Sequence, residues 1–370
     1  MRYRVLGKTE KEVSVLGFGC MRLPTVEGTD GEIDMEKAVK MVRYGIDNGI
    51  NYLDTAYFYH GGKSESFVGE VIKDGYRNKV YVATKLPLGN VNCEEDVETI
   101  FNEQLRRLGT DYIDFYLLHA VNNDSWDNRV VKYDVLSKLE KFKEQGKIKH
   151  IGFSFHDDLW VFKKVIDAYD GFEFCQIQFN YIDVDYQAGI EGLEYAASKG
   201  LGVIVMEPLL GGKLAVPHEA VASKLGEEKT PVEWALDFVW DRPEVGMLLS
   251  GMGSMQMVED NLGYADKSNV GMLTENDLAK LGEAKSAFDS MNLVPCTGCE
   301  YCMPCPAGVT IPKVFSAFNK IAEGGRRYVK EIFPDIEENA GLCKKCGKCA
   351  PACPQHIDIP EMLKKVRDKF

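Results

Sequence analysis

Residues 80–119 read VYVATKLPLGNVNCEEDVETIFNEQLRRLGTDYIDFYLLH. Two short runs of mostly apolar residues, Val80–Lys85 and Tyr112–His119, stand on either side of a longer amphipathic segment, Glu94–Leu108. The short runs predict buried strands, and the longer segment predicts a helix. Strand, helix and strand in this order are typical of folds in which parallel strands alternate with helices.

The same alternation continues over the first 290 residues. Further strands are predicted at Val13–Gly17, Asn51–Asp54, Ile148–Ser154, Phe174–Gln178, Gly202–Met206 and Gly246–Leu249. Further helices are predicted at Met35–Asn48, Glu65–Lys73, Val131–Gln145, Asp157–Ala168, Ala188–Ser198 and Pro231–Asp241. Eight strands interleaved with helices predict an α/β fold of the (β/α)8 TIM-barrel type and not an open sheet. Arg4–Leu6 and Val13–Val15 could pair as a hairpin at the bottom of this barrel.

Eight of the eleven cysteines lie in the last 75 residues, in two runs. The runs are Cys296, Cys299, Cys302 and Cys305, and Cys343, Cys346, Cys349 and Cys353. The second run matches the bacterial ferredoxin pattern, in which three cysteines hold one 4Fe–4S cluster and the fourth ligates another. The first run has one residue fewer between its last two cysteines. Zinc is the alternative metal, because Cys-x-x-Cys pairs also build zinc sites with four cysteine ligands.

Two cysteine runs predict two 4Fe–4S clusters. In the ferredoxin pattern, Cys353 would complete the ligands of the first run, and Cys305 would complete those of the second. We therefore predict a barrel domain over residues 1–290 and a small, mainly helical, ferredoxin-like domain over residues 291–370. The tail helices are expected at Ile311–Ile321, from about Arg326 to Phe333, and at Pro360–Val366. A domain of this size should bury little apolar core, so cluster ligation would supply much of its folding free energy.

Overall composition narrows the classes of partner. The chain is 45% hydrophobic and 27% charged, which is typical of a globular protein in water. Its net charge of −13 argues against nucleic-acid binding. We find neither a signal peptide nor an apolar run of about 18 residues, so we expect no membrane span and a cytoplasmic location.

Three ionisable residues end consecutive predicted strands. They are Asp54, Lys85 and His119, and Tyr59 follows Asp54 by five residues. Because the C-terminal ends of barrel strands meet at one mouth, we expect these side chains to form one site. Each residue taken alone could be a plain solvated strand end.

These four side chains would suffice to reduce a carbonyl group. A hydride delivered to the carbonyl carbon leaves an alkoxide, which needs a proton. Tyrosine has an ordinary pKa of about 10 and is a weak acid at neutral pH, but a Lys85 ammonium nearby would favour its phenolate. Asp54 would hold Lys85 in place, and His119 would donate a hydrogen bond to the substrate oxygen.

Several motifs resemble the signatures of the aldo-keto reductase superfamily. They are Asp54-Thr55-Ala56-x-x-Tyr59, Thr84-Lys85, the run from Asp111 to His119, and Gly146-Lys147-Ile148-x-x-Ile151-Gly152-x-Ser154. The resemblance implies a (β/α)8 barrel that acts on a small carbonyl substrate. It also implies Tyr59 as the general acid, assisted by Asp54, Lys85 and His119. The family binds NADPH or NADH without a Rossmann fold, and Gly-x-Gly-x-x-Gly does not follow the first predicted strand here.

The resemblance also assigns residues to the cofactor. Ser154 and Gln176 correspond to family residues that hold the nicotinamide carboxamide, although Phe155 replaces the usual asparagine. The pyrophosphate and adenosine segments correspond to Pro208, Leu209, Gly211, Gly251, Gly253, Ser254 and Asn261. Gly253 and Met257 cannot pair with a 2′-phosphate, so the choice between NADP and NAD stays open.

The two halves of the chain imply different electron chemistry. A nicotinamide transfers two electrons as a hydride, whereas a 4Fe–4S cluster takes one. A flavin could split the pair, but we recognise no flavin motif. The first reading is an NAD(P)H-linked carbonyl reductase whose clusters relay electrons, with an electron-transfer protein as a possible partner. In the alternatives the clusters are structural or sense oxygen, or the protein transfers electrons and the barrel serves as a docking module.

Overall fold

The structure, a computed structural model, describes residues 1–29, 31–291 and 293–370. It divides into two compact units. The first unit comprises Met1–Pro208 and Ala235–Leu273, and the second comprises Leu209–Trp234 and Thr274–Phe370. Within the described part of the chain, no helix combines the length and apolarity that crossing a membrane requires.

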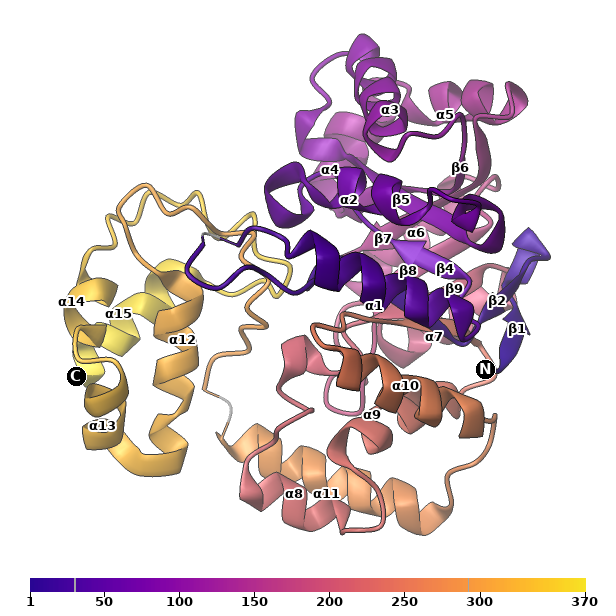
Figure 1. Ribbon diagram of the computed structural model, residues 1–370. Coiled ribbons are helices and arrows are strands. Elements are labelled where there is room, and N and C mark those ends of the chain that lie inside the picture. Colours follow the sequence, from indigo (N-terminus) through magenta and orange to yellow (C-terminus); the bar gives the residue numbers. More distant parts are fainter. Residues whose placement is uncertain (30, 292) are drawn as a thin grey trace. The chain divides into compact units, whose positions relative to one another are not determined.

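The first unit contains a closed barrel of eight parallel strands, as predicted (Figure 1). In barrel order the strands are β10 (Val245–Ser250), β3 (Leu16–Gly19), β4 (Tyr52–Asp54), β5 (Tyr81–Pro87), β6 (Ile113–Val121), β7 (Ile148–Phe155), β8 (Phe174–Gln178) and β9 (Gly202–Met206). The predicted hairpin also forms, because β1 (Tyr3–Val5) pairs antiparallel with β2 (Glu12–Ser14). Its turn inserts Leu6 into the barrel core beside the first residues of β9, so the hairpin closes the end where the strands begin.

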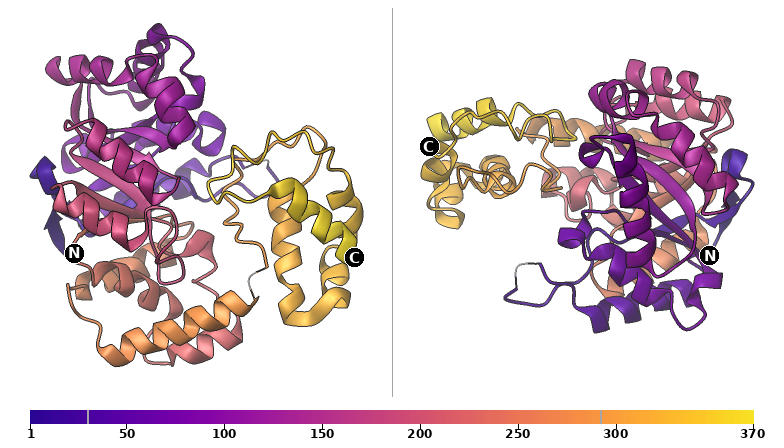
Figure 2. Two further views of the ribbon diagram at one scale, coloured as in Figure 1. Left: turned by 180° about the vertical axis from the view of Figure 1, so that it is seen from behind. Right: turned by 90° about the horizontal axis from the view of Figure 1, so that it is seen from above.

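Helices surround the strands of this unit on the outside (Figure 2). They are α1 (Met35–Asp47), α2 (Ser64–Val71), α3 (Glu94–Leu108), α4 (Asn123–Ser125), α5 (Val135–Glu144), α6 (Leu159–Ala168), α7 (Gly189–Ser198), α9 (Pro231–Trp240, which begins in the second unit) and α10 (Met255–Lys267). The helix predicted at Val131–Gln145 is shorter than expected. Asp134 takes a left-handed conformation with φ of 48°, so α5 begins only after it.

Two strand predictions need correction. The strand expected at Val13–Gly17 is divided at Val15 between the hairpin and the barrel, because its first part pairs with β1 and its second with β4 and β10. Lys85 and His119 are not the last residues of their strands. Pro87 pairs with His119 in parallel register, which extends both strands toward the barrel mouth.

Strand alternation directs the site residues into the barrel. Phe115 and Leu117 on β6 lie in the barrel core, together with Ala83 on β5 and Tyr52 on β4. Side chains two residues apart on a strand share a face. Asp54, Lys85 and His119 each follow one of these core residues by two positions, so their side chains point inward near the C-terminal ends of their strands.

The second unit is helical in its described part. Its helices are α8 (Glu219–Leu225), α11 (Glu275–Met291), α12 (Ile311–Asn319), α13 (Ile321–Ile332), α14 (Ile336–Gly341) and α15 (Ile359–Lys369). Helices α12, α14 and α15 pack on one another around a core that includes Phe315, Ile336, Leu363 and Val366. The expectation that the tail buries little core is therefore wrong. Six of the cysteines pack against this core, so apolar side chains lie next to these thiols.

Candidate active site and cysteine sites

The Lys85 ammonium is the centre of the candidate active site. Its Nζ donates to Asp54 Oδ1 at 2.7 Å and to the Thr55 carbonyl at 2.8 Å, and it lies 3.4 Å from the Tyr59 hydroxyl. Lys85 is 1% exposed and Asp54 is 3% exposed. A buried ammonium requires such partners, and an ammonium has three N–H donors for these three oxygens. The structure thus brings together three of the four predicted catalytic residues through one nitrogen atom.

Burial at the barrel mouth shifts the pKa values of Asp54 and His119 in opposite directions. Burial raises the pKa of the Asp54 carboxyl, and the Lys85 ammonium opposes that rise. Burial lowers the pKa of His119 well below its ordinary value, and the charges of Lys85 and His156 lower it further. His119 is therefore a neutral imidazole at neutral pH, with one N–H to donate. Its ring lies edge-on to that of Tyr59, with 6.1 Å between centroids.

The loop that carries Tyr59 is anchored by its next residue. Tyr59 begins a short 3-10 helix, Tyr59–Gly62, in which His60 and Gly61 have positive φ angles of 51° and 62°. The His60 Nε2 accepts the Leu23 N–H at 3.2 Å, which ties this loop to the segment after β3. Burial lowers the pKa of His60, which favours the neutral ring that this acceptor role requires. Sequence reasoning missed His60, because nothing local distinguishes it from an exposed histidine.

The two residues expected at the nicotinamide carboxamide lie side by side. Ser154 on β7 pairs in register with Gln176 on β8. The Ser154 hydroxyl accepts the N–H of Ala120, directly after His119, at 2.8 Å. The Gln176 Oε1 is buried and accepts no hydrogen bond. An unpaired buried acceptor of this kind fits a carboxamide N–H, and Ser154 holds the backbone next to His119.

The predicted adenosine segment forms the start of α10. Ser254 caps this helix by accepting the Met257 N–H at 3.3 Å. Asn261, about two turns after Ser254, donates to the Ser250 hydroxyl at 3.0 Å and so fastens α10 to the end of β10. The free N–H groups at a helix N-terminus favour bound phosphate. Asn261 therefore binds Ser250 within the protein. The N-terminus of α10 is the part of this segment that fits a phosphate.

A basic residue that sequence reasoning missed lies beside this segment. The stem of Arg22 passes so close to Gly251 that a β-carbon there would lie 3.2 Å from Arg22 Cβ. The Arg22 carbonyl lies 3.5 Å from the corresponding position at Gly253. The two glycines thus leave room for the segment after β3, which carries an exposed guanidinium suited to phosphate.

The loop after β9 divides the remaining cofactor candidates. Pro208 belongs to the first unit, whereas Leu209 and Gly211 belong to the second. Gly211 has φ of 66°, and a β-carbon there would lie 2.2 Å from the Thr297 carbonyl oxygen. This loop therefore packs directly on the backbone between the first two cysteines of the tail.

The cysteines gather in the pattern expected for two sites. Cys296, Cys299, Cys302 and Cys353 line one cavity with apolar residues of the tail core. Burial, followed by the neighbouring thiols of Cys299, Cys296 and Cys353, raises the pKa of Cys302 to about 12. Among the described residues, no three ligating side chains close on a single point as one ion requires.

The second set contains the first three cysteines of the second run and the last cysteine of the first run. Burial raises the pKa of the Cys349 thiol, and Cys343, Cys305 and Cys346 lie near enough to raise it further. Cys305 is the last cysteine of the first run, so the two runs exchange their fourth members. Thiols must lose their protons to bind metal, so raised pKa values make metal binding release protons.

Comparison with known proteins establishes the family. The aldo/keto reductase family profile matches residues 15–284, and a 4Fe-4S dicluster domain profile matches residues 295–357. This chain belongs to the aldo/keto reductase family. Both parts of the predicted fusion are confirmed, and the chain is an oxidoreductase of this family with a 4Fe–4S domain.

Named relatives agree with this assignment. L-galactose dehydrogenase of Arabidopsis thaliana is 31% identical over 281 residues, which cover 70% of this chain and 86% of that protein. The holo form of an aldo-keto reductase from Bacillus halodurans is 25% identical with a TM-score of 0.64, covering 77% of this chain and 96% of that one. An aldo-keto reductase from Klebsiella pneumoniae, solved in complex with NADPH, is 23% identical with a TM-score of 0.61. It covers 76% of this chain and 94% of that one and supports the shared fold.

Proposed function

We propose that this protein reduces an aldehyde or ketone to an alcohol, or catalyses the reverse reaction, with NADPH or NADH as the hydride donor. The observation that carries the proposal is the position of the Lys85 ammonium. It lies 2.7 Å from Asp54 Oδ1 and 3.4 Å from the Tyr59 hydroxyl at the end of the barrel where the strands terminate. Active sites of this fold lie at that end.

The proton chemistry follows from these contacts. The bound nicotinamide supplies the hydride to the carbonyl carbon. Tyr59 gives its hydroxyl proton to the oxygen that becomes the alcohol, and the nearby Lys85 ammonium stabilises the phenolate that remains. Asp54 pairs with the Lys85 ammonium and holds it in place. The neutral imidazole of His119 donates an N–H to the substrate oxygen and orients it. Because Lys85 and Asp54 are buried, their charges act with little screening by water.

Two groups of residues would hold the cofactor. The unpaired Gln176 Oε1 supports a carboxamide contact. The N-terminus of α10 and the Arg22 guanidinium support binding of phosphate groups. Leu209 and Gly211, in the loop after β9, are further candidates. None of these residues distinguishes NADP from NAD, so we propose a nicotinamide cofactor without choosing between them.

The tail would hold two 4Fe–4S clusters. The ligands would be Cys296, Cys299, Cys302 and Cys353 for one cluster, and Cys343, Cys346, Cys349 and Cys305 for the other. The cavity lined by the first set and the mutual proximity of the second set support this pairing. We propose that the clusters relay single electrons to or from a partner protein, while the barrel carries out hydride transfer.

Replacing the Tyr59 hydroxyl tests the proposed reaction. Tyr59→Phe should lower the turnover number for carbonyl reduction by about 100-fold to 10,000-fold, the range of general acid catalysis. The measurement is NADPH or NADH oxidation against a panel of aldehydes and ketones. Cluster absorbance of the variant serves as the control for an intact tail. If Tyr59→Phe has the same turnover number as the wild type, another group supplies the proton.

A further inference from the structure

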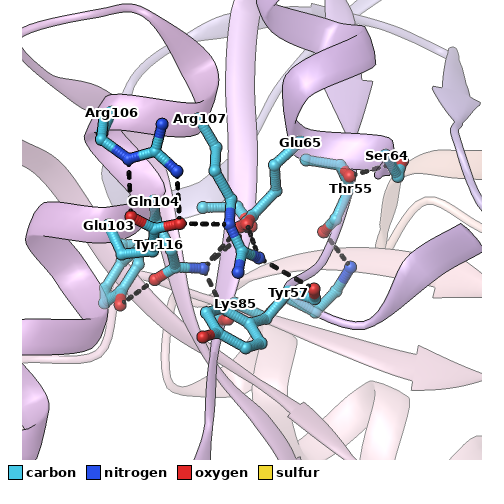
Figure 3. Close-up of polar contacts among 11 residues, drawn as sticks. Thr55, Tyr57, Ser64, Glu65, Lys85, Glu103, Gln104, Arg106, Arg107 and Tyr116 are labelled. Carbon is cyan, nitrogen blue, oxygen red and sulfur yellow. Dashed lines mark hydrogen bonds and ion pairs between the residues drawn. The ribbon is translucent and has the colours of Figure 1, made fainter. Parts of the chain in front are cut away.

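A fully buried carboxylate, Glu65, lies behind the candidate active site on the first turn of α2. It is 0% exposed. Its Oε1 accepts hydrogen bonds from Thr84 Oγ1 and Gln104 Nε2, both at 2.6 Å, and its Oε2 accepts one from Arg107 Nη1 at 3.1 Å (Figure 3). A buried charge is tolerated when it is paired and hydrogen-bonded in this way. The carboxylate thus joins α2, α3 and β5.

Gln104 connects this carboxylate to the strands that carry the site. Its Nε2 also lies 3.0 Å from the Lys85 carbonyl oxygen, and its Oε1 accepts the Tyr116 hydroxyl at 2.6 Å (Figure 3). Thr84 and Lys85 are adjacent on β5, so their side chains point to opposite faces. The outward face of the strand is therefore held by Glu65 and Gln104, while the inward face presents the Lys85 ammonium.

Arg107 connects the same carboxylate to the loop that carries Tyr59. Its Nη1 lies 3.2 Å from the Tyr57 carbonyl oxygen, and its guanidinium carbon lies 4.1 Å from the centre of the Tyr57 ring. Glu103 fixes the other side of the guanidinium, with Oε1 accepting from Arg107 Nε at 2.9 Å. Tyr57 precedes Tyr59 by two residues. One carboxylate is thus linked to the backbones that carry both Lys85 and Tyr59.

We propose that Glu65 is a positioning residue for the reaction, which through Gln104 and Arg107 sets the separation of the Lys85 ammonium and the Tyr59 hydroxyl. The inference rests on the proposed function. The separation of 3.4 Å is at the long end of hydrogen-bond distances, so a small displacement of either backbone removes the contact. Displacements of about 1 Å at a reacting group can cost about 100-fold in rate.

The test compares two isosteric substitutions at buried ion pairs. Glu65→Gln removes the charge next to Arg107. Asp114→Asn removes the charge of a matched pair, in which Arg77 Nη2 lies 2.8 Å from Asp114 Oδ2 and the Arg77 side chain is 17% exposed, as is that of Arg107. Asp114 lies near the start of β6, at the end of the strand opposite His119. Both substitutions should lower the melting temperature.

The two variants should differ in turnover. Glu65→Gln should lower kcat by about 100-fold with the KM for the carbonyl substrate unchanged, whereas Asp114→Asn should keep wild-type kcat. Glu65→Asp, which keeps the charge, should recover part of the loss. If Glu65→Gln does not fold, Gln104→Met should show a kcat loss in the same direction. This substitution removes the amide that donates to Glu65 and to the Lys85 carbonyl and that accepts the Tyr116 hydroxyl. Wild-type kcat in the folded variant, or an equal loss in Asp114→Asn, would overturn the inference.

The wild-type protein separates this inference from the proposed function. Tyr59-dependent carbonyl turnover by the wild type, together with wild-type kcat in Glu65→Gln, would reject only the positioning role of Glu65. A wild type without Tyr59-dependent turnover of any aldehyde or ketone would reject the proposed function itself, and with it the role of Glu65 in that reaction.

Discussion

His119 differs from an ordinary surface histidine because its surroundings favour the uncharged ring. Burial and the nearby Lys85 ammonium hold its pKa well below the usual value of about 6.5. A group with a lowered pKa in the folded protein keeps its neutral form as the pH falls through the ordinary value, and takes up a proton only below that. The hydrogen bond that His119 would donate to a substrate oxygen is therefore maintained in mildly acidic solution.

We predict that kcat for carbonyl reduction does not fall when the pH is lowered from about 7.5 to about 6. Over this range His119 stays neutral, and protonation elsewhere does not remove its N–H. The measurement is the pH profile of kcat at saturating cofactor. His156→Gln is the control, because His156 lies near enough to influence His119. An acid limb near pH 6.5 that persists in this variant would contradict the assignment.

The loop after β9 packs on the first cysteine run of the tail. Gly211 and Gly212 both have positive φ angles, of 66° and 93°. A β-carbon at Gly211 would lie 2.2 Å from the Thr297 carbonyl oxygen, whereas one at Gly212 would meet no atom within 4 Å. Alanine at either position would cost about 1–2 kcal/mol of backbone strain, but only alanine at Gly211 would displace the cysteine run.

We predict that Gly211→Ala reduces the iron content of the anaerobically purified protein, whereas Gly212→Ala keeps the wild-type content. Two 4Fe–4S clusters correspond to about eight iron atoms per chain. Loss of the cluster held through Cys296 should remove about half of them. The measurement is iron and acid-labile sulfide per chain, with the EPR spectrum of the reduced protein. Equal iron in the two variants would mean that this contact does not support the cluster.

At the level of elements, the sequence predicted what depends on local pattern and missed what depends on packing. The barrel strands were recognisable because each is a short apolar run between helices. Helices α4, α8, α10, α11 and α14 were not predicted. Glu65 and Arg22 lack a local signal, since their roles follow from residues about 20 to more than 200 positions away. Asp54, Lys85 and His119 could be predicted to lie together because strand ends in a barrel converge whatever the details of packing. Tyr59 was added because it follows Asp54 by five residues.

The molecule as a whole combines a barrel of the aldo/keto reductase family with a 4Fe-4S domain. Its barrel is held by parallel strands and an apolar core, and its tail has a core of its own against which the cysteines pack. Nothing in the chemistry proposed for Asp54, Tyr59, Lys85 and His119 consumes a single electron. In the proposed reaction, hydrogen therefore reaches the carbonyl carbon as a hydride from the nicotinamide, and not through the clusters.

Isotope transfer tests this step most directly. A carbonyl substrate found in the panel would be reduced in ordinary water with a nicotinamide cofactor that carries deuterium at both C4 positions, and the alcohol would be analysed by mass spectrometry and NMR. We predict one deuterium on the carbinol carbon, for the wild type and equally for Cys343→Ser, in which the second cluster has lost a ligand. Alcohol with hydrogen from water at that carbon, formed only when the clusters are intact, would contradict hydride transfer in the barrel.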